Sequence, residues 1–272
     1  AVVQGLTEFL PVSSSGHLIL ASELLGINPD GGPIFEVLLH IGTLVAVFIV
    51  YYKDVWGLIK EGVMLIVDGV RYLVNKTAHP FKMYPERKMV ILVIVASIPT
   101  AILGLFVEAF LQDLFMSSVI PVGVLLLVTC GLLLASQKIK IGKKRVEKAT
   151  YKDALAVGIV QGIATLPGIS RSGSTIVAGM AGGFDKEFAI RFSFLISIPA
   201  IAGAALLTLL KADFADLAAN WGPYLLGTVL SAVVGYLCIR TLLKLLQNNK
   251  FHYFGYYCGA MGLIAIAWGL FL

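Results

Sequence analysis

Long apolar runs separated by short polar stretches dominate the hydrophobic pattern of this chain. Each run reaches or approaches the roughly 20 residues that an α-helix needs to cross a bilayer. The pattern therefore predicts an all-α polytopic membrane protein, with full transmembrane helices at about 35–52, 89–107, 119–135, 188–210, 222–243 and 254–272.

Two further apolar stretches are interrupted and too short to span. In residues 1–26 the break falls at Pro11 and Ser13–Gly16, and in residues 153–184 it falls at Pro167–Gly168. Proline and glycine stop a helix at such points. Each stretch therefore predicts a re-entrant helix hairpin, whose irregular backbone is tolerated at membrane depth where protein buries it.

The segment after the first span has a helical period with one polar stripe. This pattern predicts an amphipathic helix over about 54–75, lying at the membrane surface. The stripe consists of Lys53, Asp54, Lys60, Glu61, Asp68, Arg71 and Asn75. A short acidic turn containing Glu108 and Asp113 is expected to join the next two spans.

The chain also repeats itself. Gln4 to Gly16 matches Gln161 to Gly173 without a gap, at an offset of 157 positions. Such a duplication around an interrupted helix is typical of folds built from two repeats, with the site at their interface. We expect one repeat in 1–137 and the other in 138–272, each containing a re-entrant hairpin and three transmembrane helices.

The distribution of basic residues orients the chain. If the first hairpin enters from outside, the inner loops receive all but two of the 21 lysines and arginines, the exceptions being Lys211 and Arg171. The positive-inside rule favours this arrangement. The second hairpin then enters from inside, so the two repeats have inverted topology and their tips meet near mid-membrane.

Composition supports the same class of protein. Of the 272 residues, 58% are hydrophobic and 14% are charged, and the mean hydropathy is +0.90, which excludes a soluble domain. The net charge of +5 comes from the loops, so nucleic acid is not an expected partner. Cys130, Cys238 and Cys258 lie in apolar runs and are interpreted as packing residues.

Arg171 is the only charged residue between Asp153 and Asp185. A guanidinium inside a bilayer is costly and requires an anionic partner. Neighbouring serines, glycines and a helix start favour a phosphate or carboxylate ligand. The alternative is a structural ion pair with Glu8, and the serine clusters have the alternative of close helix packing.

The first hairpin contributes further candidate groups. Gln4 and Glu8 lie on one helical face and could bind a divalent cation that bridges phosphate oxygens, or could form a buried polar pair. His17 follows Ser14 by three residues, a spacing that permits proton transfer with a serine or a leaving oxygen. The other histidines, His40, His79 and His252, are interpreted as structural or surface residues.

These motifs resemble those of the undecaprenyl-diphosphate phosphatase family, integral membrane enzymes associated with bacitracin resistance. The family's E/Q-x-x-x-E pattern appears at Gln4 to Glu8, followed by F-L-P-V-S-S-S-G-H at Phe9 to His17. Its P-G-x-S-R-S-G motif appears at Pro167 to Gly173. Gln4 is the glutamine variant, which leaves one carboxylate fewer for a metal ion.

The resemblance implies a hydrolase that converts a C55 polyprenyl diphosphate lipid to its monophosphate at the outer face of a bacterial inner membrane, for peptidoglycan and cell wall biogenesis. It implies Mg²⁺ or Ca²⁺ and leaves room for a homo-oligomer. Carried onto this chain, it implies four catalytic groups: Ser14 as nucleophile, His17 as base or acid, Arg171 as phosphate clamp and Glu8 as metal ligand or His17 orienter. Substrate hydrogen bonds would come from Gln4, Ser13, Ser15, Ser170, Ser172 and Thr175.

Two other classes of protein share some of these features. Lipid-phosphate phosphatases need a histidine six residues after the arginine, and this position is Val177 here, so that class is rejected. A transporter or flippase for an anionic polyprenyl lipid is the alternative that the internal duplication and the membrane arginine leave open.

Overall fold

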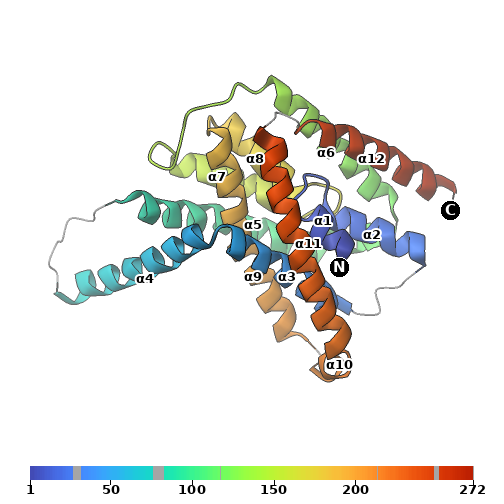
Figure 1. Ribbon diagram of the computed structural model, residues 1–272, viewed down its shortest axis with the longest axis horizontal. Helices are drawn as coiled ribbons and strands as arrows, with labels where there is room; N and C mark the ends of the chain where they lie inside the picture. Colours follow the sequence, from blue (N-terminus) through green and yellow to red (C-terminus); the bar gives the residue numbers. More distant parts are fainter. Residues whose placement is uncertain (27–31, 76–82, 117, 213, 248–250, 272) are drawn as a thin grey trace.

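The computed structural model describes residues 1–26, 32–75, 83–116, 118–212, 214–247 and 251–271 (Figure 1). Helices dominate this part of the chain, with one 3-10 turn at Ser136–Lys138. The α-helices are α1 (Val2–Thr7), α2 (Ser14–Leu25), α3 (Gly32–Val50), α4 (Tyr52–Asn75), α5 (Pro85–Met116), α6 (Ile120–Ala135), α7 (Tyr151–Ile163), α8 (Arg171–Ala181), α9 (Lys186–Leu210), α10 (Phe214–Ala219), α11 (Trp221–Gln247) and α12 (Tyr253–Phe271).

The lengths and hydropathy of these helices confirm an all-α polytopic membrane protein. Among the described residues, α5, α6, α9, α11 and α12 are each long and apolar enough to cross a membrane. Helices α3 and α4 pass the same test together, and they are bent by 93° relative to each other. The inverted orientation of the two repeats stays a prediction.

Two local predictions need correction. The acidic turn expected around Glu108 is wrong, because α5 continues as helix through Met116. Residues 105–116 contain neither proline nor glycine, and the charged residues there are compatible with a helix end that leaves the apolar layer. The short helix α10 was not expected from the hydrophobic pattern.

Helix α4 covers the predicted amphipathic segment and is joined to α5 by two ion pairs. Arg87, at the start of α5, donates to Glu61 at 3.1 Å and lies 3.0 Å from Asp68. Apolar side chains, including Trp56 and Leu73, are exposed elsewhere on α4. Helices α4 and α5 extend together from one side of the molecule (Figure 1). The position of α4 at the membrane surface stays a prediction.

Helices from the two halves of the sequence pair with each other. Helix α1 packs on α11, and correspondingly α7 packs on α5, while α6 lies alongside α12 (Figure 1). Glycines permit the close approach: a Cβ on Gly158 would lie 2.2 Å from the Ala96 oxygen, and one on Gly5 would lie 2.9 Å from the Ser231 oxygen. Each hairpin is therefore supported by a long helix of the other half.

The basic connector between the halves is fixed to both ends of the second hairpin. The Lys144 amide donates to the Gly183 carbonyl at 3.0 Å, and the Asp185 amide donates to the Lys144 carbonyl at 2.9 Å. The Lys144 ammonium also donates to Asp153, in the first turn of α7, at 3.1 Å. These bonds fix where α7 begins and α8 ends.

Candidate active site

The first hairpin places Ser13 at the start of α2 in an unusual conformation. Ser13 has φ 71° and is the only described residue other than glycine with positive φ. A side chain is strained there. The side-chain oxygen of Ser13, Oγ, accepts from the Gly16 amide at 3.4 Å and from the Gly168 amide of the second hairpin at 3.0 Å. Strain at a functional site is typically maintained by such surrounding contacts.

The second hairpin has the same construction at its own helix start. Ser170 precedes α8, and its oxygen accepts from the Gly173 amide at 3.1 Å. Thr129 of α6 stabilises the loop because its hydroxyl donates to the Gly168 carbonyl at 2.9 Å and accepts from the Ser170 amide at 3.1 Å. Gly168 itself has φ +104°, which suits glycine. Both helix starts are therefore capped by a serine.

The two hairpin tips interlock through small residues. A Cβ on Gly16 would lie 3.1 Å from the Gly168 Cα, and one on Gly173 would lie 3.0 Å from the Pro11 Cβ. The duplication relates the two contacts to each other, because Pro11 corresponds to Gly168 and Gly16 corresponds to Gly173. The tips could not come this close if larger residues replaced the glycines.

Glu8 is the centre of the polar cluster at this junction. Its carboxylate accepts from Arg171 Nη2, from Ser14 Oγ at 2.7 Å and from Gln4 Nε2 at 2.9 Å. Glu8 is only 6% exposed, and Gln4 is fully buried. Phe9 packs edge-on against Phe194 of α9 and so fixes the adjacent backbone. The cluster unites groups from both hairpins, as the duplication led us to expect.

Arg171 is the first residue of α8 and occupies the position equivalent to Ser14, the first residue of α2. The ion pair with Glu8, considered above as an alternative to anion binding, is present in the structure. The pair does not satisfy the whole guanidinium, because Arg171 Nη1 is buried without a hydrogen-bond partner among the described residues. Arg171 therefore retains a donor for a second anion.

His17 lies in the same hairpin but faces a different helix. Its Nδ1 is 2.8 Å from the Ser13 carbonyl, and its Nε2 is 2.8 Å from the Tyr257 hydroxyl of α12. Both ring nitrogens are thus engaged away from Ser14 and Glu8. The group in hydrogen-bond contact with Ser14 Oγ is the Glu8 carboxylate, which could accept its proton.

His40 of α3 was not expected at the site. Its Nε2 lies 3.7 Å from Glu8 Oε2, and its Nδ1 bonds to the Glu36 carbonyl at 2.9 Å. No local motif marks this position, which reaches the cluster through the packing of α3. His79 lies outside the described residues.

The remaining predicted binding residues surround the cluster. Ser172 Oγ donates to the Leu10 carbonyl at 3.3 Å, and Thr175 Oγ1 donates to the Arg171 carbonyl at 2.8 Å. Both residues are buried, whereas Ser15 is half-buried. The Ser172 bond therefore joins the two hairpins, whereas the Thr175 bond lies within α8. Whether either residue also binds substrate stays a prediction.

The oxygen ligands for a cation are few. Within the described ranges, no group of three or more His, Cys, Asp or Glu residues is arranged to hold a metal ion. Glu8 supplies one carboxylate, and the buried Gln4 Oε1 has no hydrogen-bond partner there. A carboxylate and an amide oxygen suit Mg²⁺ or Ca²⁺. Glu8 and Gln4 would supply two ligands to a cation, and substrate oxygens would have to supply further ligands.

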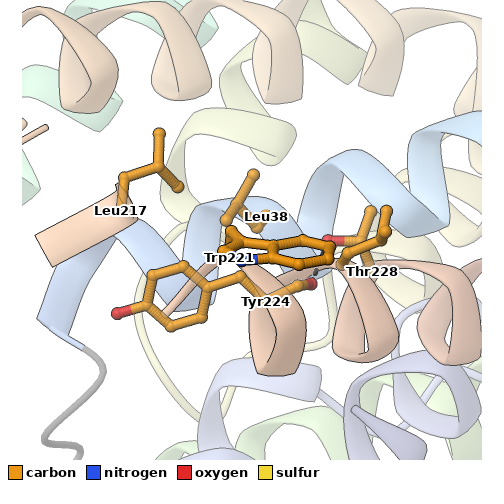
Figure 2. Close-up of a pocket in the computed structure, with 6 residues that line it drawn as sticks. Leu38, Leu217, Trp221, Tyr224 and Thr228 are labelled. Carbon is orange, nitrogen blue, oxygen red and sulfur yellow. Dashed lines mark hydrogen bonds between the residues drawn. The ribbon is translucent and has the colours of Figure 1, made fainter. Parts of the chain in front are cut away.

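An apolar surface groove lies away from this cluster. It has a volume of about 310 Å³ and is bordered by Leu38 of α3, Leu217 of α10 and Trp221, Tyr224, Leu225 and Thr228 of α11 (Figure 2). Its lining is almost entirely apolar, and it includes none of the predicted site residues.

Fold and site together define a polytopic helical membrane protein with a buried carboxylate–guanidinium centre between two broken-helix hairpins. The family model described as "Bacitracin resistance protein BacA" matches residues 1–264. The chain therefore belongs to this family.

Relatives with assigned names match over nearly the whole chain. "Undecaprenyl-diphosphatase" of Methanosphaera stadtmanae is 42% identical over 97% of this chain and 94% of the relative. Proteins with the same name from Alkaliphilus metalliredigens and Halothermothrix orenii are each 43% identical, over 99% and 97% of this chain and 96% and 94% of the relatives. The family expected from the motifs is thus confirmed.

Proposed function

We propose that this protein is a hydrolase that uses water to convert undecaprenyl diphosphate to undecaprenyl phosphate and inorganic phosphate. The observation that carries the proposal is the buried contact of Arg171 with Glu8, which itself accepts from Ser14. The cluster combines an anion-binding group, a hydroxyl and a proton acceptor. The names of the full-length relatives support the same reaction.

Arg171 supplies the charge complementarity that phosphoryl transfer requires. The terminal phosphate of the diphosphate would bind the free Nη1 donor of Arg171 at the start of α8. A planar guanidinium and a helix N-terminus both favour this ligand. Because the site is buried, charge developing on the phosphate would be stabilised more strongly than in water. Binding would also compete with Glu8 for the guanidinium, and so release the carboxylate.

Glu8 is placed to accept the proton of the attacking group. If Ser14 attacks, its proton passes to Glu8 while a P–O bond forms and the bond to the bridging oxygen breaks; water then cleaves the phosphoserine. If water attacks directly, Glu8 accepts the water proton, and Ser14 orients the phosphate. His17 would act on the leaving oxygen after its contact with Tyr257 is rearranged.

The proposal includes Mg²⁺ or Ca²⁺, for which the Glu8 carboxylate and the Gln4 side-chain oxygen would be the protein ligands. When bound, the cation would neutralise phosphate charge. Phosphate release before and after chelation, followed by re-addition of each cation, tests this. The proposal for the cation fails if a chelator leaves turnover unchanged.

The cellular setting follows from the charge distribution. With its basic loops inside, the first hairpin would open to the outer face of the plasma membrane, where the product lipid would be recycled for cell wall synthesis. After Cys130, Cys238 and Cys258 are replaced by alanine, labelling of a cysteine introduced at the exposed Leu25, the last residue of α2, by a membrane-impermeant reagent in intact cells tests the orientation. Labelling only after lysis would contradict it.

The reaction itself is tested with protein purified in detergent. Wild-type protein is expected to release phosphate from undecaprenyl diphosphate and more slowly from farnesyl diphosphate, because the shorter lipid forms fewer apolar contacts. Binding of the substrate without phosphate release would contradict the proposal and favour the transporter alternative.

A further inference from the structure

Helix α12 lies outside the cluster around Glu8 and contacts the first hairpin through two consecutive residues. The Tyr257 hydroxyl lies 2.8 Å from His17 Nε2, and Cys258 Sγ lies 3.6 Å from the Pro11 carbonyl. The rings of Tyr257 and His17 also stack, with centroids 5.5 Å apart and an interplanar angle of 11°. The two residues are 240 positions apart, so the contact is set by the fold alone.

Close packing fixes α12 at this position. A Cβ on Gly262 would lie 2.8 Å from the Gly123 oxygen of α6, and one on Gly123 would lie 2.8 Å from the Gly262 oxygen. This mutual contact brings the two backbones together, as small residues do in membrane helix pairs. Helix α6 is in turn bonded to the second hairpin through Thr129. Tyr257 is therefore held against His17 by the same scaffold that holds the two tips together.

The partners of His17 define the proton positions on its ring. A carbonyl oxygen can only accept, so Nδ1, which faces the Ser13 carbonyl, carries a proton. In neutral His17 the Nε2 lone pair then accepts from the Tyr257 hydroxyl. When His17 gains a proton, Nε2 becomes a donor, and the same hydroxyl oxygen can accept from it. Tyr257 can thus satisfy both protonation states without a rotation of the imidazole.

The geometry points to Tyr257 as a positioning residue: the Ser13 carbonyl holds the proton on Nδ1, and the Tyr257 hydroxyl gives His17 Nε2 a partner in both protonation states, so that Nε2 is the one nitrogen that exchanges a proton. This assignment rests on the proposed function where it concerns turnover. His17 is only 8% exposed, so without the hydroxyl its Nε2 would lack a partner in either state. Tyr257 is 44% exposed, which gives its side chain room to move when substrate approaches.

The substitution Tyr257→Phe tests the assignment because it keeps the stacked ring and removes only the hydroxyl. Tyr256→Phe is the matched control: the same change one residue earlier, on a tyrosine that lies near Tyr253 and His252. We expect Tyr257→Phe to lower kcat by about tenfold, the scale of one lost hydrogen bond, with KM changed by less than about twofold. Tyr256→Phe should match wild type.

A double substitution separates positioning from general damage. If Tyr257 acts through His17, adding Tyr257→Phe to His17→Gln should cause no further loss of kcat. Multiplicative losses would overturn the assignment. So would a Tyr257→Phe variant with wild-type kcat, or one that changes KM alone.

A spectroscopic measurement tests the pair without turnover. The chain has four histidines, so the ¹⁵N imidazole signals of histidine-labelled protein can be assigned with His17→Gln. We expect neutral His17 to carry its proton on Nδ1 in wild type, and Tyr257→Phe, but not Tyr256→Phe, to move the Nε2 signal toward that of an unbonded nitrogen. An unchanged signal would overturn the assignment. Wild-type protein that shows the expected signal without releasing phosphate would refute the proposed function alone.

Discussion

The two hairpin tips share one backbone design and carry different chemistry. In both, a serine caps the following helix by accepting from the glycine three residues later, at Ser13 with Gly16 and at Ser170 with Gly173. The first tip bears the carboxylate, the imidazole and the strained Ser13, whereas the second bears the guanidinium.

Equivalent positions have diverged in function. Ser14 corresponds to Arg171, and His17 corresponds to Ser174. The comparison indicates that the duplication supplies the scaffold, while substitutions at equivalent positions divide the chemistry between the halves. Substitutions at the two tips can test this division of roles.

The largest effect is expected from removing the charge of the second tip. Arg171→Ala should lower kcat/KM by about 10³-fold, because a donor to developing phosphate charge is lost. Arg171→Lys should be intermediate, since it keeps the charge without the forked geometry. Phosphate release measures both, and circular dichroism in detergent controls for folding. Activity of Arg171→Ala within a few-fold of wild type would remove this residue from the site.

Removing the imidazole of the first tip should have the next largest effect. His17→Ala is expected to lower kcat by about 10²-fold, the scale of a general acid or base. Steady-state kinetics at saturating substrate measure the change. Retention of full kcat would mean that His17 only supports the backbone through its bond to the Ser13 carbonyl.

The two capping serines should differ in how they tolerate glycine and alanine. Ser13→Ala should cost about 2 kcal/mol of unfolding free energy, because a cap and an acceptor for the Gly168 amide are lost. Ser13→Gly should recover about 1 kcal/mol of this, since φ 71° suits glycine. At Ser170, where φ is −73°, the difference between alanine and glycine should be smaller. Unfolding in detergent measures these values, and equal differences at the two positions would contradict the account.

The smallest effect is expected at the position equivalent to His17. Ser174 is buried, and its hydroxyl has no hydrogen-bond partner among the described residues. Ser174→Ala should therefore keep wild-type turnover and change stability by no more than about 0.5 kcal/mol, in the stabilising direction. A large loss of phosphate release would show that the second tip contributes more chemistry than its arginine.

Much of the architecture could be predicted from local pattern. The apolar runs located the spanning helices, and Pro11 and Pro167 located the two breaks, because both signals act within a few residues. The duplication predicted that the tips bearing Glu8 and Arg171 would lie close together, and the cost of a membrane arginine predicted an anionic partner; the ion pair between the two was the alternative to anion binding.

Other features depend on packing that no local pattern encodes. Tyr257 reaches His17 from the last helix, and His40 reaches Glu8 from α3. Neither belongs to a motif in the chain, so neither could be identified before the helices were placed. The extension of α5 through Glu108 was missed because charge was interpreted as a turn, although charged residues are also common at helix ends.

We expect Glu8 and Arg171 to act as one unit across the two tips. The most direct measurement is single-turnover phosphate release by Glu8→Gln, Arg171→Ala and the double variant. We predict that each single variant loses at least about 10²-fold and that the double variant is no slower than the slower single variant, as residues that act together behave. Losses that multiply in the double variant, or full activity in either single variant, would contradict the account.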